Sequence, residues 1–137
     1  MTFLLSRDIT GICMAGNCDY CSESGFDARF WGPSVWTILH VTAATFPCEP
    51  TAEDRIRVNT LVRSLARNLP CGSCRHHFQA AISEGGSHPL TSRVLKNRFS
   101  FFEWTVKLHN VVNKRLGKPV IEDPDAWFRA YAAHRGA

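Results

Sequence analysis

From Gly32 onward the apolar residues of this chain recur every three or four positions, the period of an α-helix with one buried face. The first such face ends at Pro47, and its members are Trp36, Leu39, His40, Ala43 and Phe46. A second helix is predicted to begin at Pro50-Thr51, because Asp54 follows Thr51 by three residues in a variant of the capping box. Its apolar stripe is Val58, Leu61, Val62, Leu65 and Leu69.

Three more helices follow in the pattern. The third is expected to start near Cys71, to turn Cys74, Phe78, Ala81 and Ile82 inward, and to stop at Gly85-Gly86. The fourth is long, from about Ser92 to Leu116, with one face formed by Leu95, Phe99, Phe102, Val106, His109, Val112, Asn113 and Leu116. The fifth is short: Asp123-Pro124 begins it, and Trp127 and Tyr131 lie within it. With no longer run of alternating residues, the prediction is all-α, a four-helix bundle plus a short fifth helix.

Residues 1–28 differ from the rest, with several glycines and three of the six cysteines. We therefore expect a flexible, cysteine-containing N-terminal arm over 1–28 and one folded domain over 29–137. No apolar run approaches the roughly 20 residues of a membrane-spanning helix, and the first residues do not resemble a secretory signal or a transit peptide. We expect a cytoplasmic protein with no membrane insertion. The net charge of +4 is mild and gives no reason to expect nucleic acid.

The cysteines form two pairs with a two-residue spacing, Cys18/Cys21 and Cys71/Cys74. Pro70 suggests that Cys71 lies where a helix begins, and the positive end of a helix dipole stabilises a thiolate. The second pair therefore reads as a redox-active dithiol. The pairing of the other four cysteines, which include Cys13 and Cys48, stays open. The alternative is a zinc-binding interaction module that uses both pairs, although the interval of about 50 residues exceeds that of common zinc ribbons.

His40, His109 and Asn113 interrupt faces that otherwise read as core. Burying a polar group without a partner costs roughly 1–3 kcal/mol, so these side chains either find protein partners or line a polar ligand. Three of them on facing helices, with a redox dithiol between them in sequence, favour the ligand. A flat heteroaromatic cofactor needs aromatic walls, which Trp31, Trp36, Phe46, Trp104 and Trp127 could supply. The basic run from Lys114 to Lys118 is either a solvated helix end or a clamp for a pyrophosphate.

Three blocks of this sequence closely resemble the Erv/ALR flavin-linked sulfhydryl oxidases. They are Trp36-Thr37-Ile38-Leu39-His40 with Phe46-Pro47, Leu69-Pro70-Cys71-Gly72-Ser73-Cys74, and the stretch from His109 to Pro119. Their order and intervals agree from about Trp31 to Trp127. The short chain and the Arg75-His76-His77 sequence after the dithiol are more similar to the versions encoded by large cytoplasmic DNA viruses, which implies the host cytoplasm or the virion as location.

The resemblance implies FAD as cofactor, a homodimer, and a thiol oxidase that converts protein dithiols to disulfides while O2 becomes H2O2. No metal is implied. Cys74 would lie against the isoalloxazine ring as the charge-transfer thiolate, and Cys71 would be the exposed interchange cysteine. The positions that match FAD-contacting residues of the family are Gly32, Trp36, His40, Phe46, His77, His109, Asn110, Asn113, Lys114, Lys118 and Trp127.

Many members of this family carry a second dithiol on a flexible arm, and Cys18 and Cys21 fit that shuttle role. Two features depart from the family pattern. No cysteine follows Cys74, so packing of Trp127, Phe128 and Tyr131 must hold the last helix. Pro33 stands where cellular members often have a basic residue, which removes one polar contact to the cofactor.

Overall fold

The computed structural model describes residues 25–136, and these fold into helices with no strand among them. The helices are α1 (Ala28–Thr45), α2 (Ala52–Asn68), α3 (Gly72–Ile82), the short 3₁₀ helix η2 (Val94–Lys96), α4 (Arg98–Arg115) and α5 (Pro124–Ala132). The predicted all-α bundle with a short fifth helix is therefore confirmed. Nowhere in the described part is a helix long and apolar enough to cross a membrane.

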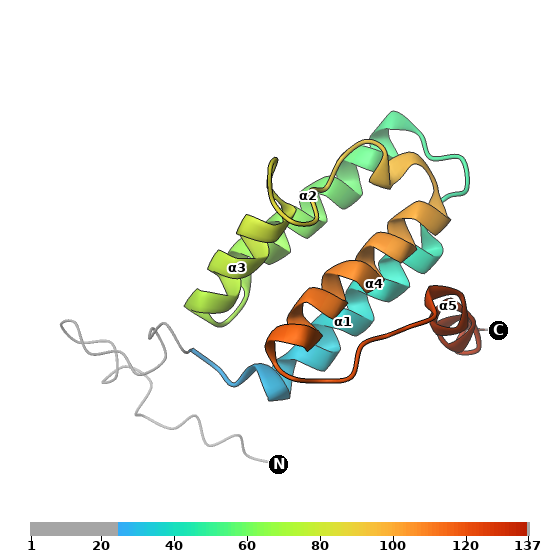
Figure 1. Ribbon diagram of the computed structural model, residues 1–137. Helices are drawn as coiled ribbons and strands as arrows, with labels where there is room; N and C mark the ends of the chain where they lie inside the picture. Colours follow the sequence, from blue (N-terminus) through green and yellow to red (C-terminus); the bar gives the residue numbers. More distant parts are fainter. Residues whose placement is uncertain (1–24, 137) are drawn as a thin grey trace, which may run out of the picture.

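The bundle has two layers (Figure 1). Helices α1 and α4 pack against each other in one layer, and α2 and α3 pack against each other in the second. α5 lies at the side of the first layer, where it contacts both α1 and α4. The linker that follows α4 runs back along the bundle to reach α5 (Figure 1).

Local capping explains several helix ends. Thr51 caps α2, and its hydroxyl and the Asp54 carboxylate form the predicted capping box. Asp123 caps α5 directly before Pro124, as the sequence indicates. Both signals lie within one helical turn, so the sequence carries them without tertiary information.

Two predicted helix starts are wrong. α1 begins at Ala28 rather than near Gly32, because the Asp27 carboxylate accepts a hydrogen bond from the Arg29 backbone N–H and so caps the helix, and Pro33 lies inside it. The long fourth helix does not run from Ser92. A second capping box, formed by Asn97 and Ser100, starts α4 at Arg98, and the residues before it form only the short η2.

The core is formed by side chains of α1, α2, α3 and α4. Its fully buried side chains include Leu39, Val62, Phe101, Val106 and Leu108. The predicted faces are correct for most positions, but Leu61, Phe99 and Leu116 are exposed. The buried face of α4 is wider than predicted, because Phe101, Trp104, Thr105 and Leu108 are buried in addition to Phe102 and Val106.

Candidate functional site

A cavity of about 710 Å³ opens between the first half of α1, α3, the second half of α4 and α5. This volume lies in the range typical of small-molecule and cofactor sites. Its walls are mostly apolar and aromatic, with a few polar groups. The lining includes Trp31, Gly32, Trp36, Cys74, His77, Phe78, Leu108, His109, Asn113, Arg115, Lys118, Trp127 and Tyr131.

The disulfide Cys71–Cys74 lies at the edge of this cavity. Cys71 is the N-cap of α3, as Pro70 predicts, and its Sγ accepts a hydrogen bond from the Cys74 backbone N–H at 3.2 Å. Cys74 is half-buried and lines the cavity, whereas Cys71 does not. The helix start therefore places only one of the two cysteines, Cys74, in the cavity wall.

The expectation that Cys71 is exposed is wrong in this conformation, because its exposed fraction is only 6%. The segment before α1 lies over it. The Phe26 backbone N–H donates to the Pro70 carbonyl at 2.7 Å. Gly25 has a φ of +50°, and a Cβ there would lie 2.1 Å from the Pro70 oxygen and 3.0 Å from the Cys71 Cα. Only glycine fits such a close approach, since the conformation and the contact both exclude a side chain.

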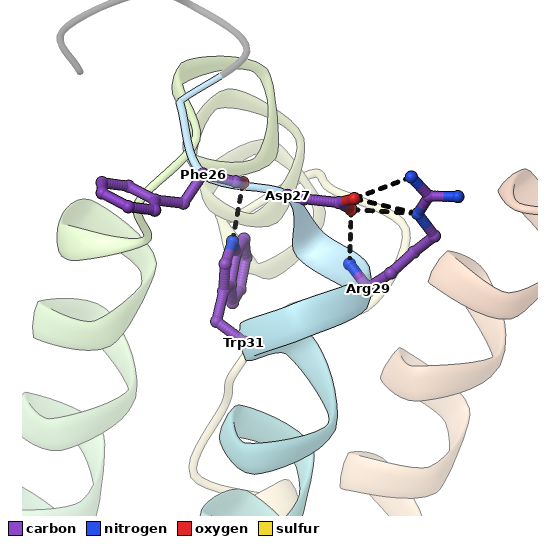
Figure 2. A network of polar contacts seen from close by, with 4 residues as sticks. All are labelled: Phe26, Asp27, Arg29 and Trp31. Atoms are coloured by element: carbon purple, nitrogen blue, oxygen red, sulfur yellow. Dashed lines mark hydrogen bonds and ion pairs between the residues drawn. The ribbon is translucent and has the colours of Figure 1, made fainter.

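The same segment is tied to the cavity wall. The Trp31 indole N–H donates to the Phe26 carbonyl oxygen at 2.8 Å, and Figure 2 shows the indole pointing at this oxygen. Asp27, the next residue, caps α1 and pairs with Arg29 (Figure 2). Hydrogen bonds within residues 26–31 therefore connect the segment over Cys71 to the N-terminus of α1 and to the Trp31 side chain in the cavity wall.

Two hydrogen-bonded histidines lie at this site, His109 in the cavity wall and His40 behind it. His109 stacks on Trp36, with ring centroids 4.2 Å apart and an interplanar angle of 10°. His40 is fully buried behind them, and its Nε2 lies 3.0 Å from the Nδ1 of His109. Burial lowers the pKa of His40 to about 3, and burial together with the Lys118 charge lowers the pKa of His109 to about 4. Both imidazoles are therefore neutral at physiological pH.

Asn110 and Asn113 lie one turn apart on α4 and differ in their surroundings. The Asn110 amide donates to the Ile121 carbonyl at 2.9 Å and accepts from the Ile121 N–H at 2.8 Å. It therefore holds the linker between α4 and α5. Asn113 is buried at the cavity wall, and its amide makes only a long 3.4 Å contact to Asn110.

Seven of the predicted cofactor-contacting residues line the cavity: Gly32, Trp36, His77, His109, Asn113, Lys118 and Trp127. Four others do not. His40 lies behind His109, Asn110 holds the linker, Lys114 is exposed outside the lining, and Phe46 packs on Phe101 at the other end of α1. The candidate shuttle residues Cys18 and Cys21 lie outside the described residues, as does Cys13, whereas Cys48 is an exposed free thiol.

Thr105 and Tyr131 are among the contributors that were not predicted as site residues. The Thr105 hydroxyl lies 2.9 Å from the Nδ1 of His40. Tyr131 lines the cavity, and its ring meets the His40 ring edge-on. The signal for Thr105 is present in the sequence, because Thr105, His109 and Asn113 recur at intervals of four and so share one helix face.

The zinc alternative is not supported. Cys71 and Cys74 are joined to each other, so neither offers a thiolate to a metal. Within residues 25–136 no group of three or more His, Cys, Asp or Glu side chains is placed to hold a metal ion.

Comparison with known proteins gives a consistent result. The Erv1 / Alr family matches residues 33–132. A probable FAD-linked sulfhydryl oxidase of Acanthamoeba polyphaga mimivirus is 38% identical over 70% of this chain, and the match spans 65% of its length, just under two thirds. An FAD-linked sulfhydryl oxidase of African swine fever virus is 38% identical over 66% of this chain and 71% of its own. The FAD-binding domain of Erv1 from Saccharomyces cerevisiae superposes with a TM-score of 0.70 at 27% identity, over 81% of this chain and 99% of that domain.

Proposed function

This chain belongs to the Erv1 / Alr family, and from that premise we propose that it is an FAD-linked thiol oxidase that forms disulfide bonds in protein substrates. The observation that carries the proposal is the Cys71–Cys74 disulfide at the edge of an aromatic cavity that Cys74 lines. A dithiol can pass electrons onward only if one of its sulfurs reaches the acceptor. The site meets that condition.

The residues of the cavity fit FAD. Trp36 and His109 form a flat wall, and apart from the adjoining residues of its own helix nothing lies within 4 Å of the position where a Gly32 side chain would begin. Within the described chain, the indole N–H of Trp127 is buried without a hydrogen-bond partner, and the Trp127 side chain belongs to the cavity wall. Lys118 and Arg115 supply positive charge for a pyrophosphate.

When bound, FAD supplies a two-electron acceptor that returns its electrons to O2 and so yields H2O2. The protein's part is to hold the flat rings between aromatic side chains, to keep water out, and to present the Cys74 sulfur at the cavity. The Cys74 thiolate at the first turn of α3 benefits from the positive end of the helix dipole.

Thiol exchange at Cys71 begins the reaction. A substrate thiolate attacks the Cys71 Sγ, the Cys71–Cys74 bond breaks, and Cys74 leaves as the thiolate. The second substrate thiolate then displaces Cys71, so that the substrate becomes a disulfide and the pair becomes a dithiol. The Cys74 N–H that donates to the Cys71 Sγ stabilises Cys71 as a leaving thiolate. The Gly25–Phe26 segment must shift from its position before a bulky substrate reaches Cys71.

Cys18 and Cys21 are proposed as a shuttle dithiol that passes electrons from substrates to Cys71–Cys74. The support is chain length: Cys21 precedes Gly25 by four residues, which span at most about 14 Å, and Gly25 lies against Cys71. Replacing Cys18 and Cys21 with Ala should slow protein substrates more than a small dithiol. Equal rates for this variant and the wild type on a protein substrate would remove the shuttle.

The proposed partners are protein dithiols, O2 and a second copy of this chain. A homodimer is supported by apolar side chains that α1 leaves exposed, namely Phe30, Ile38 and Val41. Sedimentation velocity tests it: Ile38→Glu should shift the protein from dimer to monomer, and an unchanged sedimentation coefficient would argue against this face.

The decisive test is a visible absorption spectrum of the purified protein, recorded before and after dithiothreitol is added in air. We expect flavin bands that bleach and recover as O2 is consumed. Cys74→Ser should keep the bands and lose turnover, while Cys48→Ser, at an exposed free thiol, is the matched control and should retain both. A colourless protein that retains stoichiometric zinc would refute the oxidase.

A further inference from the structure

The hydroxyl of Thr105 starts a chain of hydrogen bonds with only one possible direction. Its Oγ1 lies 2.7 Å from the Phe102 carbonyl oxygen, which can only accept. A hydroxyl carries a single hydrogen, so that hydrogen points to Phe102. The Nδ1 of His40 lies 2.9 Å from the same Oγ1, and the oxygen must therefore accept from it. The proton of His40 is on Nδ1.

The proton on the His40 Nδ1 also determines which ring donates in the hydrogen bond between His40 and His109. His40 is fully buried and neutral, so it carries only one ring proton, and its Nε2 offers a lone pair. The Nδ1 of His109 lies 3.0 Å from this Nε2 and must donate to it. His109 is also neutral, since burial and the nearby Lys118 charge disfavour its charged form. The Nε2 of His109 is then left without a proton.

We propose that Thr105 is a positioning residue that fixes the tautomers of His40 and His109, so that His109 presents the lone pair of Nε2 as a hydrogen-bond acceptor to the cavity. The inference rests on the proposed function, in which FAD occupies this cavity. The lone pair on the His109 Nε2 selects an N–H or O–H donor group of FAD. The cavity wall then offers a hydrogen-bond acceptor at His109.

Removing the hydroxyl reverses the chain. In Thr105→Val the His40 Nδ1–H loses its acceptor inside the core, and a buried donor without a partner is unfavourable. Moving the proton to the His40 Nε2 relieves this, because the Nε2 proton can point to the His109 Nδ1. His109 must then carry its own proton on Nε2, so the cavity wall presents a hydrogen-bond donor at this position instead of an acceptor.

The test is the ¹⁵N spectrum of the histidine rings in the purified, FAD-bound protein. We expect His40 and His109 both to be protonated on Nδ1 in the wild type and in Thr105→Ser, which keeps the hydroxyl. Thr105→Val should move both protons to Nε2. FAD affinity, measured by release of flavin fluorescence, should fall roughly tenfold in Thr105→Val, the size of one lost hydrogen bond, and be restored in Thr105→Ser.

A wild-type His109 protonated on Nε2 overturns the proposal, and this holds even if Thr105→Val does not fold. Tautomers that stay the same in Thr105→Val overturn it as well. Inverted tautomers with unchanged FAD affinity would show that His109 is not an acceptor for the cofactor. A protein without flavin would refute the proposed function, while the ring protons would still decide the role of Thr105.

Discussion

Asn110 and Asn113 offer a direct comparison between a residue that holds the fold and one that faces the cavity. Both are asparagines on α4, three residues apart, so Asn110→Ala and Asn113→Ala remove the same atoms from the same helix. Asn110 makes two hydrogen bonds to the backbone of Ile121, at 2.9 and 2.8 Å. Asn113 makes one long contact of 3.4 Å.

The expected costs differ accordingly. A hydrogen bond contributes about 0.5–1.5 kcal/mol net, so the loss of both bonds to the half-buried Ile121 should cost about 1–3 kcal/mol in Asn110→Ala. For a domain of this length each kcal/mol lowers Tm by about 4 °C, and the expected drop is therefore roughly 4–12 °C. Asn113→Ala loses no bond of normal length, so its free energy of unfolding should change by less than about 1 kcal/mol.

Urea denaturation of the FAD-free proteins measures this difference, because bound cofactor would add its own stabilisation. FAD titration of the same samples should show the larger loss of affinity in Asn113→Ala, whose side chain lines the cavity. If the two variants lose equal stability, Asn110 does not hold the linker in the way described. If Asn110→Ala loses more FAD affinity than Asn113→Ala without unfolding, its role lies at the cofactor.

Two other predictions follow from buried groups. The pKa of His40 at about 3 and of His109 at about 4 lie below the 6.5 of an unperturbed histidine, so the unfolded chain binds more protons below pH 6.5. As the pH falls toward 4, the fully buried His40 should lower the free energy of unfolding by about 1.4 kcal/mol per pH unit, and the partly exposed His109 should lower it by less because solvent screens its charge. Urea titrations unchanged from pH 7 to 5 would contradict this. Gly25→Ala should undock the segment over Cys71 and speed the reduction of the disulfide by dithiothreitol. The control is Gly85→Ala, because Gly85 also has a positive φ but an added Cβ there would meet nothing within 4 Å. Equal reduction rates for the two variants would show that residues 25–26 do not shield Cys71.

The sequence predicts most accurately those helix ends that depend only on residues within one or two helical turns. The capping signals of α2 and α5 and the start of α3 at Cys71 are local, and all appear in the structure. The break before α4 was also local, since Asn97 and Ser100 form a capping box, but a continuous apolar pattern through Leu95 concealed it.

Tertiary contacts decide the rest. Cys71 is buried because Gly25 and Phe26 dock on Pro70, some 45 residues along the chain, and no periodicity encodes that approach. The amide of Asn110 is committed to Ile121 because the linker turns back along α4. Residue type alone shows that a polar group must find a partner, and leaves open whether that partner is a cofactor or the chain itself.

α5 buries none of its nine residues completely, yet Trp127 and Tyr131 on this helix form part of the cavity wall. An element held by so few buried contacts exchanges between docked and open states more readily than the core helices do. A ligand that contacts this wall favours the docked state, by about 2.7 kcal/mol at a concentration 100 times its dissociation constant. Amide hydrogen exchange along α5 should therefore slow when the ligand binds, so exchange along this helix reports the loading of a purified sample with its cofactor.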